Sequence, residues 1–150
     1  MSRLANITRI SAFALALAMS SCSVVTSEGA DHRPLRVRSC IGDVVPLCSI
    51  LTIGDDGRTE YIRRGERTLR GRIGDSDLDA LFATLRGVAL ETIPGDERAV
   101  GSAVTIELGH ATRTFSVHAL PDKIVPLLKT IDRIGMRSFG RKYRNIMTQP

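Results

Sequence analysis

The stretch Leu47–Arg64 constrains the fold most, because it has the pattern of two strands joined by a tight turn. Isoleucine, leucine, threonine and tyrosine, which suit a pleated sheet, stand on both sides of a Gly-Asp-Asp-Gly sequence. A three-residue loop, Asp55–Gly57, would end in a glycine at positive φ and form a bulged hairpin. This loop length predicts two cross-strand pairs on one face, Ile53 with Thr59 and Leu51 with Tyr61. We therefore expect a small β-containing domain.

Two further segments extend the predicted sheet around this hairpin. Leu35–Ser39 alternates apolar residues with two arginines, a pattern that suits an edge strand whose outer face is charged. A two-residue turn, Gly65-Glu66, leads into Arg67–Ile73 and would pair Ile62 with Leu69. That pair lies on the face opposite to the hairpin's apolar pairs. Either both faces of the sheet are partly covered, or one of the two registers differs.

A second hairpin is expected after a polar loop at residues 91–102. Its strands are Ala103–Leu108 and Thr112–Leu120, joined by a four-residue loop. The predicted pairs, which give one apolar face, are Ile106 with Phe115 and Val104 with Val117. His110 then falls in the turn, and His118 falls on the outer face of the second strand.

Two segments have the helical spacing of apolar residues. The first begins at Ser76, a candidate N-cap with Asp79 three residues later, and ends near Gly87. The second begins at Pro121-Asp122 and is expected to stop at Gly135. The predicted buried stripes are Leu78, Leu81, Phe82, Leu85 and Val88 in the first helix, and Ile124, Val125, Leu128, Ile131 and Ile134 in the second.

The order of these elements is four strands, a helix, two strands and a helix. It predicts an α+β domain at residues 35–136, followed by a basic tail at residues 137–150. A mainly antiparallel sheet of about five to six strands would carry both helices on one face.

Residues 1–21 have the organisation of a secretory signal peptide. Met1–Arg9 carries two arginines and no acid, and the uncharged run Ile10–Met19 follows it. This run is too short to span a bilayer, since a spanning helix needs about 20 apolar residues. The next residues, Ser20-Ser21-Cys22, resemble the lipobox of bacterial lipoproteins, in which the cysteine is acylated. Ordinary cleavage, for example after Ala18, is the alternative.

The lipobox resemblance also implies a location. Ser23 follows the cysteine, and by the sorting rule of Gram-negative lipoproteins this implies the periplasmic face of the outer membrane. Residues 22–34 are small and polar, and we expect them to form a flexible tether that includes His32.

If Cys22 is lipidated, two cysteines remain in an oxidising compartment, and pairing of Cys40 with Cys48 is the default expectation. The alternatives are reduced core cysteines or a metal or redox role. Two thiols are too few for a structural zinc site, and the spacing is not Cys-x-x-Cys.

The first half of the domain resembles a family of small, secreted, uncharacterised bacterial proteins, many of them lipoproteins, that share a domain of unknown function. The resemblance covers residues 36–85. The residues that carry it are Cys40, Gly42, Pro46, Leu51, Ile53, Asp56, Gly57, Tyr61 and Gly71. It departs at the second cysteine, which usually stands directly before the proline, where this chain has Val45. The resemblance implies fold and location and transfers no catalytic residue.

Composition narrows the function classes. The chain has 21 basic and 16 acidic residues, and the charge of +5 suits weak attraction to anionic surfaces. It has no tryptophan and few other aromatic residues, so no stacking platform for nucleic acid is visible. In the tail, four cations are candidates for contact with an anionic surface: Arg137, Arg141, Lys142 and Arg144. The interpretation that we favour is nevertheless a solvated, frayed tail.

No catalytic residue, metal ligand or cofactor is assigned. Asp96 and Glu97 lie in the polar loop, where nothing apolar surrounds them to shift a pKa. No motif of a known nucleophile or metalloprotease is present. The sequence therefore favours a non-catalytic, lipid-anchored envelope module that binds an envelope protein or an anionic polymer. An envelope enzyme with an unrecognised site, and an inhibitor or adaptor of an envelope enzyme, are the alternatives.

Overall fold

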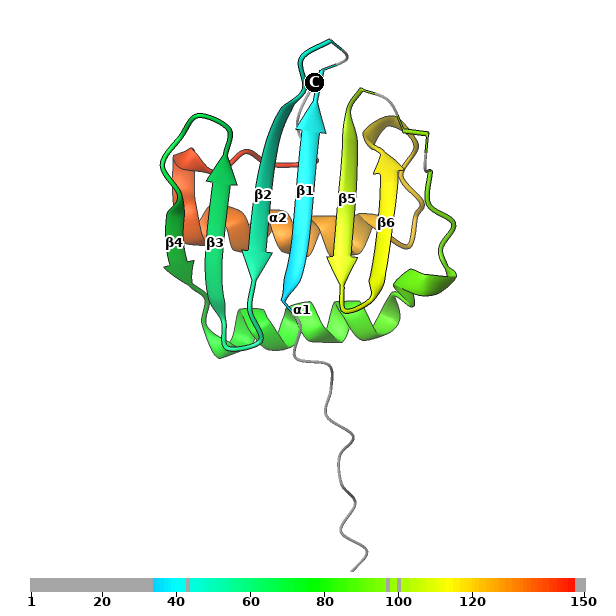
Figure 1. Ribbon diagram of the computed structural model, residues 1–150. Coiled ribbons are helices and arrows are strands. Elements are labelled where there is room, and N and C mark those ends of the chain that lie inside the picture. Colours follow the sequence, from blue (N-terminus) through cyan, green and yellow to red (C-terminus); the bar gives the residue numbers. More distant parts are fainter. Residues whose placement is uncertain (1–33, 43, 97, 100, 148–150) are drawn as a thin grey trace, which may run out of the picture.

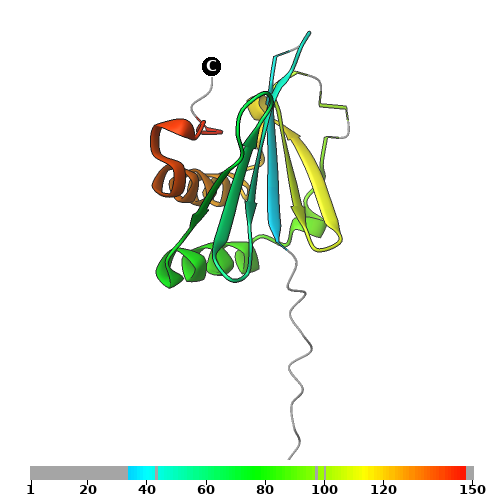
Figure 2. The same ribbon diagram turned by 60° about the vertical axis from the view of Figure 1, so that its left-hand side comes forward.

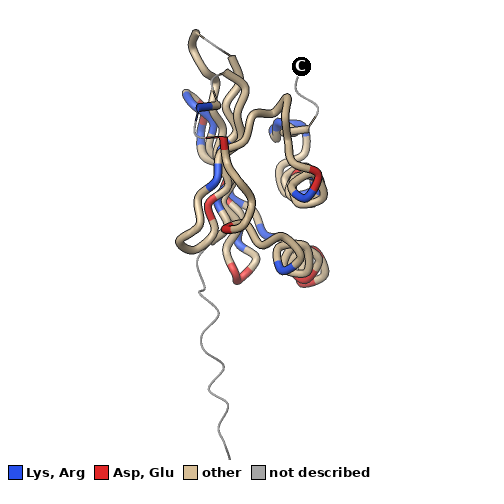
Figure 3. The backbone as a smooth tube through the Cα atoms, turned by 90° about the vertical axis from the view of Figure 1, so that its right-hand side faces the viewer, with Lys and Arg blue, Asp and Glu red and all other residues tan. Residues whose placement is uncertain are grey.

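The computed structural model describes residues 34–147 apart from positions 43, 97 and 100. The predicted signal peptide, Cys22, His32 and Glu97 lie outside the described residues. Within them, six strands form one antiparallel sheet, and two helices lie on one of its faces (Figures 1 and 3). This confirms the predicted α+β fold with its order of four strands, helix, two strands and helix.

The strands are β1 (Leu35–Ile41), β2 (Leu47–Ile53), β3 (Arg58–Arg63), β4 (Leu69–Arg72), β5 (Ala103–Leu108) and β6 (Ala111–Ser116). The α-helices are α1 (Asp75–Gly87) and α2 (Val125–Phe139), and three short 3-10 helices are η1 (Leu90–Thr92), η2 (Val117–Ala119) and η3 (Gly140–Lys142). The sheet order is β4-β3-β2-β1-β5-β6. The edges of the sheet are therefore β4 and β6.

The β2–β3 hairpin has the predicted register. Ile53 pairs with Thr59 and Leu51 with Tyr61. Gly57 has a φ of 78°, as the bulged three-residue loop requires. The Gly54 amide closes the loop by donating to the Arg58 carbonyl at 2.8 Å.

The prediction that the first strand lies at an edge is wrong. β1 is central and pairs with β2 on one side and β5 on the other, with Val37 between Leu51 and Ile106. Its pattern of alternating apolar and arginine residues has another cause. One face of the whole sheet is buried by the helices, and the other face is open, so a central strand needs the same alternation as an edge strand.

The predicted β3–β4 register is wrong by one residue. Tyr61, not Ile62, pairs with Leu69, so Leu69 joins the buried face. Of the two alternatives that the sequence left open, the different register is therefore the correct one. The turn has Gly65 at a φ of 78°, and the Glu66 amide donates to the Arg63 carbonyl at 3.0 Å. A one-residue shift changes the face of every side chain in a strand.

The second hairpin is shifted by two residues. Its turn is Gly109–His110 rather than a four-residue loop, and Val104 pairs with Phe115 instead of Val117. The second strand ends at Ser116, and His118 lies in η2, exposed. Because the shift is an even number, the predicted apolar face was retained.

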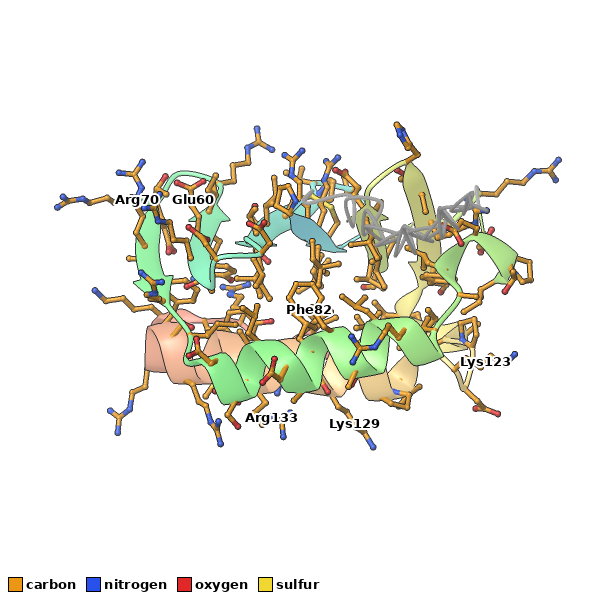
Figure 4. The ribbon with its side chains drawn as sticks, turned by 90° about the horizontal axis from the view of Figure 1, so that it is seen from below. Glu60, Arg70, Phe82, Lys123, Lys129 and Arg133 are labelled. Carbon is orange, nitrogen blue, oxygen red and sulfur yellow. A yellow bond between two sulfur atoms is a disulfide. The ribbon has the colours of Figure 1, made fainter. Side chains whose placement is uncertain are left out.

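The core lies between the sheet and the two helices. Leu81 and Leu85 of α1 and Ile131 of α2 are buried in this core. The side chain of Phe82 points into the space between the sheet and the helices (Figure 4). α1 begins after Gly74, without a side-chain cap, so the predicted Ser76 N-cap is wrong. The acids of its first turn still oppose the positive end of the helix dipole.

α2 begins at Val125, with Ile124 as its N-cap, so Asp122 is not the cap. The helix also runs past the predicted stop at Gly135 and ends at Phe139, where Gly140 has a φ of 55°. Gly135 serves a different purpose, since a Cβ there would lie 2.3 Å from the ring of Tyr143. A glycine is needed in mid-helix because that ring packs directly against the backbone.

The chain after α2 is packed, which contradicts the expectation of a solvated tail for these residues. Tyr143 and Ile146 belong to the core. The Tyr61 ring lies 5.6 Å from that of Phe139 and 5.2 Å from that of Tyr143. The segment that follows α2 therefore packs against the β3–β4 side of the sheet, on the face that the helices cover (Figure 2).

Candidate binding surface

One whole face of the sheet faces away from the helices, and we call its outward side chains the open face (Figure 3). The strand registers arrange these side chains in rows across all six strands. The longest row is Arg70, Glu60, Thr52, Arg36, Glu107 and Thr112. Within this row Glu60 pairs with Arg70 at 3.2 Å and Glu107 with Arg36 at 3.5 Å. The open face is thus mainly polar, with two apolar members, Ile50 opposite Arg38 and Ile62 opposite Ile50.

The centre of the open face combines a cation with two hydroxyls. Arg38 of β1 pairs in register with Thr105 of β5. The Thr105 and Thr114 hydroxyls are 3.0 Å apart and share a hydrogen bond. These are groups that can accept or donate to a polar partner laid across the sheet.

A disulfide joins Cys40 and Cys48, as the cysteine count predicted. The two residues lie directly opposite each other in β1 and β2, with a Cα–Cα distance of 4.0 Å. Their sulfurs lie on the open face beside Arg38, whose Nη2 is 3.7 Å from Cys48 Sγ. The bridge fixes the base of the β1–β2 loop.

The loop above the disulfide exposes apolar side chains. Val44 is 92% exposed, Val45 67% and Leu47 54%. This hairpin end lies at the opposite end of the sheet from the start of β1 (Figure 1). The three residues lie within four consecutive positions, so the exposed apolar surface is concentrated on this loop.

The β6 edge is covered by residues 90–96, which we call the edge strap. The Asp96 amide donates to the Thr114 carbonyl at 2.7 Å. Arg113 donates from Nε to the Ile93 carbonyl at 3.1 Å and from Nη2 to the Glu91 carbonyl at 2.8 Å. Leu90 and Ile93 are buried, so this part of the predicted polar loop is an ordered cover for the sheet.

The β4 edge has no comparable cover among the described residues. Beside it lies a hollow of about 490 Å³ lined by Arg67, Thr68, Leu69, Arg70 and Lys142. Figure 4 shows Arg70 and Glu60 together at this margin, on the side away from the helices. Three of the five lining residues are cations, so the hollow is electropositive.

The four cations predicted for anionic-surface contact do not form one patch. Arg137 is bonded to Asp77 of α1 at 2.5 Å. Arg141 and Lys142 are exposed in η3, and Lys142 reaches the β4 hollow. Arg144 lies beside Arg63 and Arg64, where β3 ends, in a separate hollow that faces β2. The cations of the tail are thus divided between two surfaces that also contain cations from the β3–β4 region.

One buried charge, Asp132, was not predicted from the sequence. Asp132 of α2 is 3% exposed and accepts hydrogen bonds from the Tyr143 hydroxyl and the Ile146 amide, each at 2.8 Å, and from the Met147 amide at 2.9 Å. Burial raises the pKa of the Asp132 carboxyl, and these donors partly offset the effect. Burial and the nearby carboxylate raise the pKa of Tyr143 as well. All three donors come from the segment that follows α2, so Asp132 holds this segment against the helix by hydrogen bonds.

The remaining candidates do not assemble into a reactive site. His110 lies in the β5–β6 turn and His118 in η2. The described residues hold no group of three or more His, Cys, Asp or Glu side chains placed to share a metal ion. In the same part of the chain, no helix has the length and apolar character needed to cross a membrane.

No protein-family model matches the chain, and no curated protein matches it either.

Proposed function

We propose that this protein is a lipid-anchored module of the bacterial cell envelope that binds another envelope component and performs no reaction. The observation that carries the proposal is the open face, which spans six strands and which no described element covers. Its arginines, threonines and glutamates stand in fixed rows, which suits recognition of an extended polar partner. The apolar side chains of the two helices and of the sheet face that they cover are packed in the core.

The anchor in this proposal is Cys22, acylated at the periplasmic face of the outer membrane, with residues 22–34 as its tether. The Cys40–Cys48 bridge supports an exported location, because disulfides form and persist in oxidising compartments. The partner is an envelope protein or an anionic polymer. An inhibitor or adaptor of an envelope enzyme would be the same module with one particular partner.

The anchor is tested with the Cys22→Ala variant. We expect this change to abolish labelling by a fatty-acid analogue and to stall removal of the signal peptide. The serine at position 20, changed to alanine, is a matched control that keeps the small residue and the cysteine. A Cys22→Ala protein that matures to the normal size and stays membrane-bound would contradict lipidation.

Binding is tested by photo-crosslinking in cells. A photoreactive residue replaces Thr105 on the open face or, as control, Lys129, which points away from the sheet on α2 (Figure 4). We expect a specific adduct from position 105 and none from position 129. Equal capture from both positions would reject the open face. Loss of a cellular phenotype in folded His110→Ala or His118→Ala protein would favour an enzyme.

A further inference from the structure

The β4 edge has backbone groups that point away from the sheet. The Ile73 amide donates to the Gly57 carbonyl at 2.9 Å, so this residue faces β3. Residues alternate in an antiparallel pair, so Gly71 and Leu69 also direct their backbone groups to β3. Arg70 and Arg72 then direct an N–H and a C=O each outward. No hydrogen bond from another described residue meets these groups.

The side chains around this edge are strongly basic. Arg70 and Arg72 stand on the open face, and both are exposed. Arg67 and Lys142 line the adjoining hollow. Glu60 is paired with Arg70 at 3.2 Å, and Arg72 lies in register with another cation, Arg58. Several positive charges therefore surround one short length of strand that can still form backbone hydrogen bonds.

We propose that the β4 edge is a docking site for an extended, acidic peptide segment of a partner protein, which adds a seventh strand beside β4. Backbone hydrogen bonds to Arg70 and Arg72 would supply affinity, and side-chain alternation would supply specificity. The inference rests on the proposed binding function and adds the β4 edge, at the margin of the open face, as the place where a strand of the partner pairs.

The alternation predicts the pattern of the partner. Side chains beside Arg70 and Arg72 would lie on the open face, where acidic residues match the two cations. The residue between them would lie on the helix side, near Leu69 and the ring of Phe139, whose Cε1 is 3.4 Å from a Cβ built at Gly71. An acidic–apolar–acidic sequence fits this edge.

The same charges argue against a second copy of this chain. Pairing of two β4 edges would bring Arg70 and Arg72 of both copies together, and like charges opposite each other destabilise a sheet. Cations on short edge strands are a common protection against such pairing. At β4 the cations would repel a second copy of the chain or any basic strand, and would attract an acidic strand.

The test measures binding of two fluorescent seven-residue peptides to the mature protein in zwitterionic micelles. One peptide alternates glutamate with valine and the other alternates lysine with valine. We expect the glutamate peptide to bind at least tenfold more tightly, and to do so less well as salt increases. Hydrogen exchange should show new protection at the Arg70 and Arg72 amides.

Three variants locate the contact. Arg70→Glu with Arg72→Glu should weaken binding of the glutamate peptide at least tenfold and favour the lysine peptide. Lys129→Glu with Arg133→Glu makes the same charge change on the far side of α2 and should leave binding unchanged (Figure 4). Arg72→Pro removes an outward N–H that Arg72→Gln keeps. The proline variant should bind several-fold more weakly than the glutamine variant.

Several results would overturn the proposal. They are equal affinity for the two peptides, protection that appears away from β4, and equal loss in both charge-reversal variants. Binding of anionic phospholipid vesicles that depends on Arg70 and Arg72, without peptide binding, would replace the peptide with a lipid surface. Capture from Thr105 in cells without peptide binding would reject this edge but retain the binding module.

Discussion

The two edges of the sheet solve one physical problem in opposite ways. At β6, the outward carbonyls of Thr112 and Thr114 accept hydrogen bonds from Arg113 Nη1 and the Asp96 amide. At β4, the outward groups of Arg70 and Arg72 have no partner among the described residues, and cations surround them. The β6 edge is covered by hydrogen bonds from neighbouring residues, whereas the β4 edge is uncovered and surrounded by cations that disfavour pairing with another basic strand.

The difference shows where specificity can reside. A covered edge contributes stability and offers fewer free carbonyls to another strand. A charged, uncovered edge contributes little to stability and selects what can approach it. Beneath β4 the support comes from the other layer, where Asp132 holds the segment that packs under Tyr61. The comparison therefore predicts large effects below β4 and on β6, and small ones on the β4 surface.

The largest effect is expected for Asp132→Ala, which removes the support beneath β4. Three donors from residues 143–147 lose their acceptor in the core, so the free energy of unfolding should fall by about 3 kcal/mol. Urea denaturation measures it. Asp122→Ala removes an exposed acid from the same region of sequence and should change stability little. A small loss of stability for Asp132→Ala would mean that residues 143–147 pack without these hydrogen bonds.

A smaller loss is expected at β6 for Arg113→Met, which keeps the apolar part of the side chain but frees the edge strap. Loss of its hydrogen bonds to three carbonyls should cost about 2 kcal/mol and increase hydrogen exchange in residues 90–96. Arg70→Met is the matched change on β4. Its side chain is 82% exposed, so stability should stay within about 0.5 kcal/mol of the parent. Equal losses would abolish the distinction between the edges.

Alkaline pH should weaken the support beneath β4 through Tyr143. The folded state raises the pKa of its hydroxyl, so ionisation is favoured in the unfolded chain above the ordinary pKa of 10.0. Stability from this group is complete below pH 10 and should fall above it by up to about 1.4 kcal/mol per pH unit. Tyr143→Phe should flatten this part of the pH profile in thermal denaturation. An unchanged slope would assign the loss to other groups.

The smallest effect concerns single amides of β4. Because Arg70 and Arg72 point outward, their amides should exchange rapidly, whereas those of Gly71 and Ile73 should be protected by β3. Residue-resolved hydrogen exchange by NMR measures this alternation. The opposite alternation would show that β4 is shifted by one residue, as the two-residue turn had predicted.

The parts of the fold that sequence predicted well are those where two local signals agree. In the β2–β3 hairpin, loop length and side-chain alternation specify one register. At β4, Gly65 is compatible with more than one turn length, and local pattern did not decide between them. At β5–β6, a two-residue shift preserves the buried face, so the alternation was unable to detect the error.

The C-terminal segment shows why the remainder was missed. Asp132 follows Ile131 inside the apolar stripe of α2, and Tyr143 and Ile146 come after a sequence rich in cations. An acid within the stripe and apolar residues beyond the expected helix end were the available signals. Their meaning depends on a contact between residues eleven or more positions apart, which no local pattern specifies. The bonding directions at β4 likewise require the register.

The central position of β1 determines how the domain bears load. The chain enters the sheet at Leu35, so a pull from the preceding residues acts along the axis of β1. Its hydrogen bonds to β2 and β5 run across that axis, and those on both flanks resist sliding together rather than opening one after another. At the far end, the Cys40–Cys48 bond transfers tension into β2 covalently. The force needed to unfold the domain should therefore be much higher when it is pulled through β1 than when it is pulled through β4 or β6.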